Sequence, residues 1–263
     1  MSPEPGFFGQ VWEWFGDPIH WEGPFGVPAR LYEHVVLSAV SLAIAAAIAL
    51  PIGMYIGHRR RFEFLVVSVA NLGRAIPSFG LLFLFVLMFG IGLDAPAALR
   101  PAILFALVLL AIPPILTNTY VGIQVVDADT LESARGMGMG EGRVLLGIEV
   151  PLAAPLIMAG LRTAAVQVVA TATLGAVVAG GGLGRFILDG FAARDQAQIV
   201  AGAILVAGLA IVTELGFGLL ERLVRPRTSS RGRAGRRRLE EAPLRYAGQA
   251  GEPGGGGPFP GWE

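Results

Sequence analysis

Residues Val35 to Gly57 read "VVLSAVSLAIAAAIALPIGMYIG", and none of them carries a charge. About 20 consecutive apolar residues are needed to cross a hydrocarbon core about 30 Å thick, and this run is long enough. The whole chain has the same character, because 54% of its 263 residues are apolar and its mean hydropathy is +0.63. Soluble domains carry more charge. The sequence therefore predicts a membrane protein.

Four further apolar runs follow, at residues 64–93, 101–126, 150–184 and 196–220. A helix satisfies its own backbone hydrogen bonds in lipid, so the five runs predict an all-α polytopic transmembrane bundle over residues 31–223. The second and fourth runs contain "NLGRAIPS" and "GAVVAGGGLG". Glycine and proline at these places are typical of half-helices or re-entrant segments.

The arginines predict the orientation of the five spans. The chain has no lysine, so all 20 basic residues are arginine. Fourteen of them fall on one side of the spans: Arg59, Arg60, Arg61, Arg135, Arg143 and nine from Arg222 to Arg245. The other side has only Arg30, Arg100, Arg185 and Arg194. By the positive-inside rule the N-terminus lies outside and the C-terminus in the cytoplasm of a plasma-membrane protein.

The two ends of the chain differ from the apolar middle. Residues 1–30 contain Trp12, Trp14 and Trp21 among proline and glycine, which indicates an external interfacial segment rather than a cleavable signal peptide. Residues 224–263 include "RTSSRGRAGRRR" and "GEPGGGGPFPGWE". This composition cannot bury enough apolar surface to fold, so we expect a disordered cytoplasmic tail, in contact with anionic lipid at most.

One charged stretch, "LESARGMGMGEGRVLLGIEVP" at residues 131–151, interrupts the apolar runs on the arginine-rich side. Asp129 as N-cap with Glu132 at the third helical position predicts the start of a short helix. The closely spaced glycines end it, because each costs about 1 kcal/mol in a helix interior. A second short helix is expected from about Arg143, with Pro151 at its junction with the fourth span.

Three interpretations of this cytoplasmic loop, residues 127–151, compete on physical grounds. It is an amphipathic loop on the lipid headgroups, a glycine-rich phosphate cradle, or a docking element for a partner. A phosphate cradle is disfavoured, since no strand precedes the glycines and the chain has no lysine. The absence of cysteine also removes thiolate metal sites and a cysteine nucleophile.

The loop resembles the cytoplasmic loop of the inner-membrane permease subunits of ABC importers. Their pattern is E-A-A, three residues, G, nine residues and I-x-L-P. The residues that match it here are Glu132, Ser133, Ala134, Gly138, Ile148, Val150 and Pro151. Ser133 and Val150 depart conservatively from the pattern. The segments "RAIPSFGLLFLFVLMFGIG", "PPILTNTYVGIQVVD", "ARGMGMG", "IMAGLRTAAVQ" and "ATATLGAVVAGGGLGRFI" resemble the glycine betaine, carnitine and choline branch.

The resemblance implies a division of labour among several proteins. This chain is expected to be one of two permease subunits, the same or sister chains, with two cytoplasmic ATPase subunits that bind the ATP and an external solute-binding protein. It implies no cofactor, metal or nucleic acid on this chain. The implied function is import of a small osmoprotectant such as glycine betaine, choline or carnitine, with amino acids or another small solute as the alternative.

The residues of the transport pathway are less clearly indicated. Arg74 and Arg162 lie inside apolar runs, where a charge facing lipid is costly, so each is expected to face protein or water. The uncharged polar candidates for the pathway or gate are Asn71, Asn118, Thr171 and Thr173. The glycines at 180–182 and 184 suit either a mobile external gate or close helix packing.

A membrane enzyme and a passive channel are the rival functions. His20, His34 and His58 are the only histidines, and His58 falls on the opposite side of the predicted membrane from the other two. A metal cluster or histidine-based triad is therefore not expected. A passive channel has no need of the cytoplasmic docking pattern.

Overall fold

The structure is a computed structural model that describes residues 6–61, 64, 66, 68–69, 75–90 and 100–224. These residues belong to the first of two compact units, Met1–Arg225, and the second, Pro226–Glu263, lies outside the described part together with the predicted tail. The described elements are α1 (Phe7–Gly16), η1 (Pro18–His20), α2 (Val27–Arg59), α4 (Ser78–Phe89), α5 (Pro101–Gln124), α6 (Ala128–Gly136), α7 (Glu141–Val144), η3 (Leu145–Glu149), α8 (Val150–Ala172), η4 (Thr173–Val178), α9 (Gly184–Ala193) and α10 (Gln196–Val224).

Four helical stretches are long and apolar enough to cross a membrane: Val27–Arg59, Pro101–Gln124, Glu141–Val178 and Gln196–Val224. They confirm the predicted all-α membrane-spanning class. The remaining expected span, residues 64–93, lies partly outside the described residues, and its labelled helix α4 has 12 residues. The count of five therefore stays a prediction.

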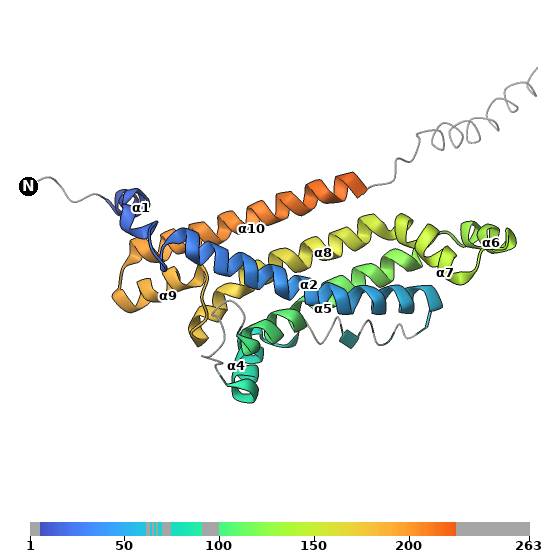
Figure 1. The fold of residues 1–263 in the computed structure, drawn as a ribbon, viewed down its shortest axis with the longest axis horizontal. Helices are drawn as coiled ribbons and strands as arrows, with labels where there is room; N and C mark the ends of the chain where they lie inside the picture. The colour runs from blue at the N-terminus through green and yellow to red at the C-terminus, as the bar shows by residue number, and fades with distance from the viewer. Residues whose placement is uncertain are drawn as a thin grey trace, which may run out of the picture. The chain divides into compact units, whose positions relative to one another are not determined.

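Helices α2 and α5 run in the same direction. Gly53 of α2 packs on Leu116 and Thr119, and Gly57 packs one turn later, on Ile123. Both helices end where α6 and α7 lie, at the end of the bundle opposite to α1 and α9 (Figure 1). The end of α2 and the start of α5 therefore lie at opposite ends of the bundle, as the predicted second span between them requires.

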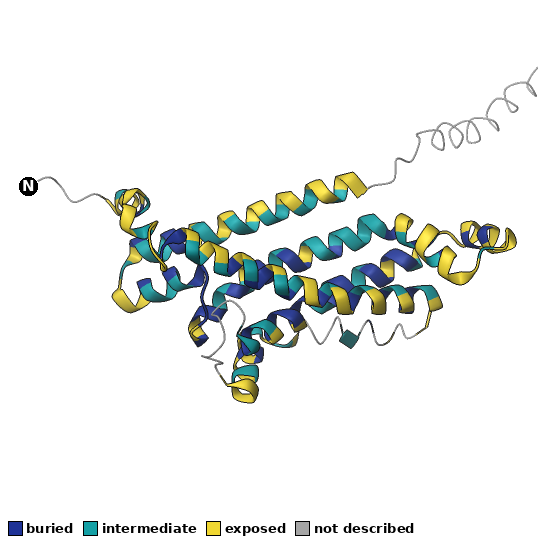
Figure 2. Ribbon diagram, in the orientation of Figure 1, coloured by how far each residue is buried: buried dark blue, intermediate teal, exposed yellow. Residues whose placement is uncertain are grey.

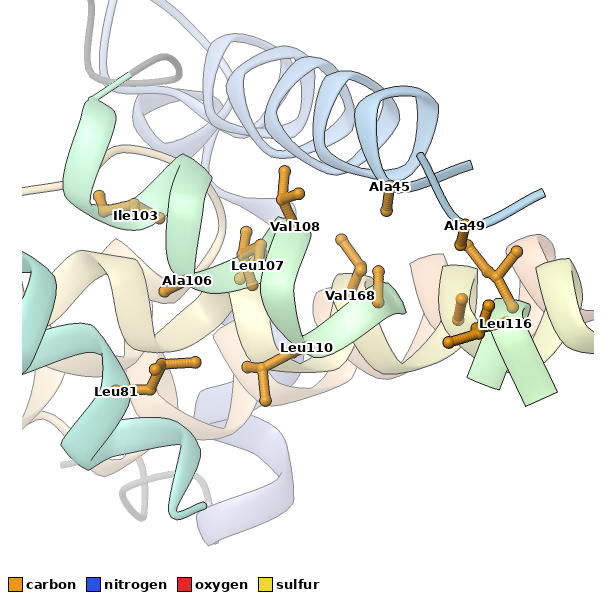
Figure 3. Close-up of a cluster of buried hydrophobic side chains, with 14 of the residues drawn as sticks. Ala45, Ala49, Leu81, Ile103, Ala106, Leu107, Val108, Leu110, Leu116 and Val168 are labelled. Atoms are coloured by element: carbon orange, nitrogen blue, oxygen red, sulfur yellow. The ribbon is translucent and has the colours of Figure 1, made fainter. Parts of the chain in front are cut away.

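Helix α5 lies at the centre of the bundle and packs against α2, α4 and α8. Figure 3 shows Ala45 and Ala49 of α2, Leu81 of α4 and Val168 of α8 meeting the side chains of α5. Ala45 and Ala49 are fully buried, and such small side chains let neighbouring helices approach closely. Because lipid tails are as apolar as leucine, this close packing is what holds the helices together.

The most exposed apolar surface in the described bundle belongs to α10, which is largely yellow and teal in Figure 2. Leu215 and Leu223 are 62% and 81% exposed. An exposed and predominantly apolar helix is suited to face lipid or another membrane subunit.

The N-terminal segment is ordered by aromatic packing. Trp14 of α1 lies edge-on to Phe186 with ring centroids 5.4 Å apart and stacks on His20 at 4.2 Å. The opposite face of α1 exposes Phe8 and Trp12, which are 84% and 80% exposed. This amphipathic arrangement suits the predicted interfacial segment, whose place in the membrane stays a prediction.

Candidate functional site

The loop between α5 and α8 begins with a capped helix, α6. Asp127 is the N-cap, and its side chain accepts hydrogen bonds from the Thr130 backbone N–H at 3.2 Å and from the Thr130 hydroxyl at 3.0 Å. The expectation that Asp129 caps the helix is therefore wrong by two residues. Asp127 has the non-helical backbone that an N-cap needs, whereas Asp129 already lies inside the first helical turn.

Helix α6 ends in a Schellman motif at Gly138. The Met139 N–H donates to the Ala134 carbonyl at 3.2 Å and the Gly138 N–H to the Arg135 carbonyl at 2.9 Å, which is the pairing that defines the motif. Gly138 has φ +83°, in the left-handed region that disfavours residues with a Cβ atom. The glycine of the sequence pattern is thus the residue that turns the chain.

A small apolar core holds the loop together. Leu131 and Ala134 of α6 are buried with Val126 and Val144, and Met139 and Ile148 pack against them. Glu132 and Ser133 lie on the other side of α6 and are exposed. The pattern residues therefore divide into two groups, with Ala134 and Ile148 packing inward and Glu132 and Ser133 available to a partner.

The second half of the loop differs from the expected helix and proline junction. α7 begins at Glu141 and continues through the π-helical turn η3 into α8, so Glu141–Val178 is one helical stretch. Pro151 lies just after this π-helical turn and does not interrupt the stretch. The Val150 N–H bonds the Leu145 carbonyl in the π-helical turn that precedes it. Val150 is partly buried and Pro151 is exposed.

Four ionisable side chains join the loop to the end of α2. Arg135 contacts both carboxylate oxygens of Glu141, at 2.9 and 3.1 Å, and this hydrogen bonding raises the pKa of the Arg135 guanidinium. His58 lies with Nε2 3.1 Å from Glu141 Oε2 and Nδ1 2.6 Å from Glu149 Oε2. The sequence did not predict these contacts of His58, and its position directly after an uncharged span is the one signal that the sequence offers.

The structure does not bring the described pathway candidates together. Asn118 donates from its side-chain amide to the Pro114 carbonyl at 2.8 Å, and the Thr173 hydroxyl donates to the Ala170 carbonyl at 2.7 Å, so both bond their own helical segment. Thr171 borders a small space between α4, α5 and η4. Asn71 and Arg74 lie outside the described residues. A role for these residues in the pathway stays a prediction.

Arg162 of α8 is held by two carboxylates of α10. It pairs with Glu214 and lies 3.4 Å from Glu221, beside an open space between α8 and α10 of about 470 Å³. The charge thus faces protein, as its position in an apolar run required. The arrangement favours a structural ion pair between helices.

The glycine-rich segment at residues 180–184 is buried against the N-terminal part of α2. Glu33 accepts a hydrogen bond from the Gly182 N–H at 2.8 Å. His34 is 1% exposed, with Nε2 2.9 Å from the Val169 carbonyl oxygen and Nδ1 accepting from the Leu183 N–H at 3.2 Å. These contacts favour close packing over a mobile gate.

These features define a polytopic α-helical membrane protein with an ordered polar loop at its arginine-rich end. Residues 49–229 match the family described as "Binding-protein-dependent transport system inner membrane component". The match covers more than half of the chain, so the chain belongs to this family. It is a multi-pass transport subunit of the plasma membrane and not an enzyme, and the predicted family resemblance is confirmed.

Two relatives are similar over most of their length. The chain is 38% identical over 201 residues to the carnitine transport permease protein OpuCD of Listeria monocytogenes, covering 76% of this chain and 87% of the relative. It is 34% identical over 212 residues to the choline transport system permease protein OpuBB of Bacillus subtilis, covering 81% and 91%.

The fold is also similar to a solved structure, an inward-facing conformation of the MetNI methionine ABC transporter. The TM-score is 0.65 at 19% identity, and the likeness covers 74% of this chain and 94% of that chain. At this identity the comparison shows the fold alone.

Proposed function

We propose that this chain is the permease subunit of an ATP-driven importer for a small osmoprotectant, a quaternary amine such as glycine betaine, carnitine or choline. One observation carries the proposal: the chain is 38% and 34% identical, over most of both chains, to permeases named for carnitine and choline transport. The folded cytoplasmic loop supports the ATP-driven part, because a passive channel needs no such element.

The proposed assembly has two permease subunits, two cytoplasmic ATPase subunits and an external solute-binding protein. The family description, which names binding-protein-dependent transport, supports the last of these. ATP binds the ATPase subunits and not this chain, which has no lysine for a P-loop. This chain supplies the membrane passage and the docking loop.

The docking surface is the exposed side of α6 and the turns next to it. Glu132 and Ser133 are exposed there, and Met137 and Leu146 are 77% and 66% exposed although both are apolar. Exposed apolar side chains rimmed by charges are typical of protein interfaces. The buried contacts of Leu131 and Ala134 hold α6 in a fixed orientation. A movement of the ATPase subunits against this surface is therefore transmitted to α5 and α8.

Selectivity for the quaternary amine resides mainly on the external binding protein. Proteins usually hold a permanent cation in a cage of aromatic rings. The phenylalanines of α4 form two separate groups instead: Phe79 pairs with Phe83 at 4.8 Å, while Phe85 and Phe89 pack against Phe105 of α5. Neither group has the geometry of a cage, so we expect the permease to offer a weak, mostly neutral passage.

Uptake by cells that express the whole assembly tests this function. Labelled glycine betaine, choline and carnitine should enter, and uptake should stop when the ATPase subunit is inactivated by substitution of its nucleotide-binding lysine. Unlabelled methionine or histidine should not compete. Competition by an amino acid, with none by a quaternary amine, would discard the substrate class, and uptake that persists with the inactive ATPase would discard the ATP-driven importer.

A further inference from the structure

The end of α2 contacts the docking loop through the side chain of His58. This imidazole is 9% exposed and lies between Glu141 of α7 and Glu149 of η3, with nitrogen-to-oxygen distances of 3.1 and 2.6 Å. Each ring nitrogen faces one carboxylate oxygen, so the imidazole bridges the two acidic side chains.

The bridge matters most for Glu149, which is 2% exposed. Within the described part of the chain, the hydrogen-bond partner of the Glu149 carboxylate is His58. A buried carboxylate without a partner costs much free energy. The contact therefore holds both the Glu149 and the His58 side chains in place. Glu141 adds a second connection, which continues to Arg135 of α6.

The same end of α2 is packed rigidly on α5. A Cβ atom on Gly53 would lie 2.8 Å from Thr119 Cβ, and one on Gly57 would lie 2.7 Å from Ile123 Cβ. Such close contacts of a G-x-x-x-G pair hold two helices together over a full turn. His58 follows directly after Gly57, so this close helix contact holds the backbone that carries the imidazole in place.

The loop is directly continuous with α5 and with α8, whereas α2 is separated from it in sequence by α4 and α5. We propose that His58 is a positioning residue that makes α2 move together with the docking loop when the ATPase subunits move that loop. The connection runs from α6 through Arg135 and Glu141, and from η3 through Glu149, to the imidazole. This inference rests on the proposed ATP-driven function.

Two variants separate this role from a contribution to stability alone. His58→Ala breaks both contacts and leaves Glu149 buried without a partner, so the assembly should lose stability. His58→Ala/Glu149→Gln removes that buried charge and should recover much of the thermal stability, while the connection to α2 stays broken. Glu149→Gln alone keeps an acceptor for His58 and should behave like the parent. Arg60→Asn is the matched control, because it removes a neighbouring cation at a left-handed position that asparagine tolerates.

The readout is the amount of solute imported per ATP hydrolysed by the complete assembly in proteoliposomes. For His58→Ala/Glu149→Gln we expect this ratio to fall at least about tenfold, because both contacts of the imidazole are lost and each hydrogen bond to a charged group corresponds to about a factor of ten. Glu149→Gln and Arg60→Asn should keep the parental ratio. A double variant with the parental ratio would overturn the inference while leaving the proposed function intact. A parent assembly without ATP-dependent uptake would overturn both.

A distance measurement gives a second test that needs no disabled variant. The chain has no cysteine, so spin labels on Arg60→Cys and Gly142→Cys are unique within it. Both positions are exposed, and they lie at the C-terminal end of α2 and in the loop. We expect one unchanged distance between the labels with and without ATP, because His58 holds the two elements together. A shift of several ångströms between the two states, about one helical turn or more, would contradict the inference.

Discussion

Gly138 is the residue on which the shape of the docking loop most depends. Its φ of +83° places it in the left-handed region, where a residue with a Cβ atom costs about 1–2 kcal/mol. Gly138→Leu should abolish uptake and weaken ATPase association, with insertion and abundance near normal, because the turn at the end of α6 opens. Gly138→Asn should be milder, since asparagine tolerates this conformation.

Gly142→Leu is the control for this prediction, because Gly142 lies in the same loop, has ordinary helical backbone and has open space around its Cβ position. Copurification of the ATPase and uptake of labelled solute are the measurements. Parental uptake by Gly138→Leu would mean that the left-handed turn is not required for docking.

Asp127 and Glu132 are expected to contribute differently to the same helix. Asp127→Ala removes the N-cap of α6 and should cost about 1 kcal/mol of local stability, seen as faster hydrogen exchange across Thr130 and Leu131. Glu132→Ala should leave exchange unchanged, because Glu132 is exposed and does not cap the helix. If Glu132→Ala still weakens ATPase copurification, Glu132 is a direct contact. Faster exchange in Glu132→Ala would contradict this assignment.

At the scale of elements, sequence reasoning located the docking loop but not its attachment. The spacing from Glu132 to Pro151 predicted a helix, a turn and a second helix. Such features are predictable because helix caps and left-handed glycines depend on residues close in sequence. The π-helical turn before Pro151 and the contacts of His58 were not predictable in this way. They depend on which helices meet in space, and His58 is separated from Glu149 by 91 residues.

The contact between α2 and α5 makes a further prediction at this scale. A Cβ atom on Gly57 would lie 2.7 Å from Ile123 Cβ. Gly57→Ala should therefore lower the free energy of unfolding of the purified protein by about 1–3 kcal/mol. Gly208→Ala in α10 is the matched control, because open space surrounds Gly208. Alanine is the better helix former, so this control should be neutral or slightly stabilising. Equal effects of the two substitutions would mean that the helices do not pack closely at Gly57.

At the scale of the whole molecule, hydropathy alone was enough for the class of fold and for the four spans that the structure describes. The residues of the transport pathway could not be predicted from hydropathy. Thr173 and Asn118 bond their own helical segments, and Arg162 pairs with Glu214 and lies within 4 Å of Glu221. A polar residue in a span has several ways to be satisfied, and residue type does not distinguish them.

The orientation in the membrane is predicted by the distribution of the arginines, fourteen on one side and four on the other. A reporter that is active only in the cytoplasm should be active when fused after Arg245 and silent when inserted near Asp94. The parallel run of α2 and α5 predicts that Arg59 and Arg100 lie on opposite sides of the membrane, and the arginine count decides which side is cytoplasmic. Activity near Asp94 with silence after Arg245 would reverse the orientation and place the docking loop outside the cell.

Uptake by a purified assembly is the measurement that tests the proposed function most directly. Proteoliposomes should contain this permease, its ATPase on the inside with ATP, and the solute-binding protein outside. Labelled glycine betaine, choline or carnitine should accumulate inside against its gradient, and omission of either ATP or the binding protein should abolish the accumulation. Equal uptake without ATP, or accumulation only of an amino acid, would contradict the account.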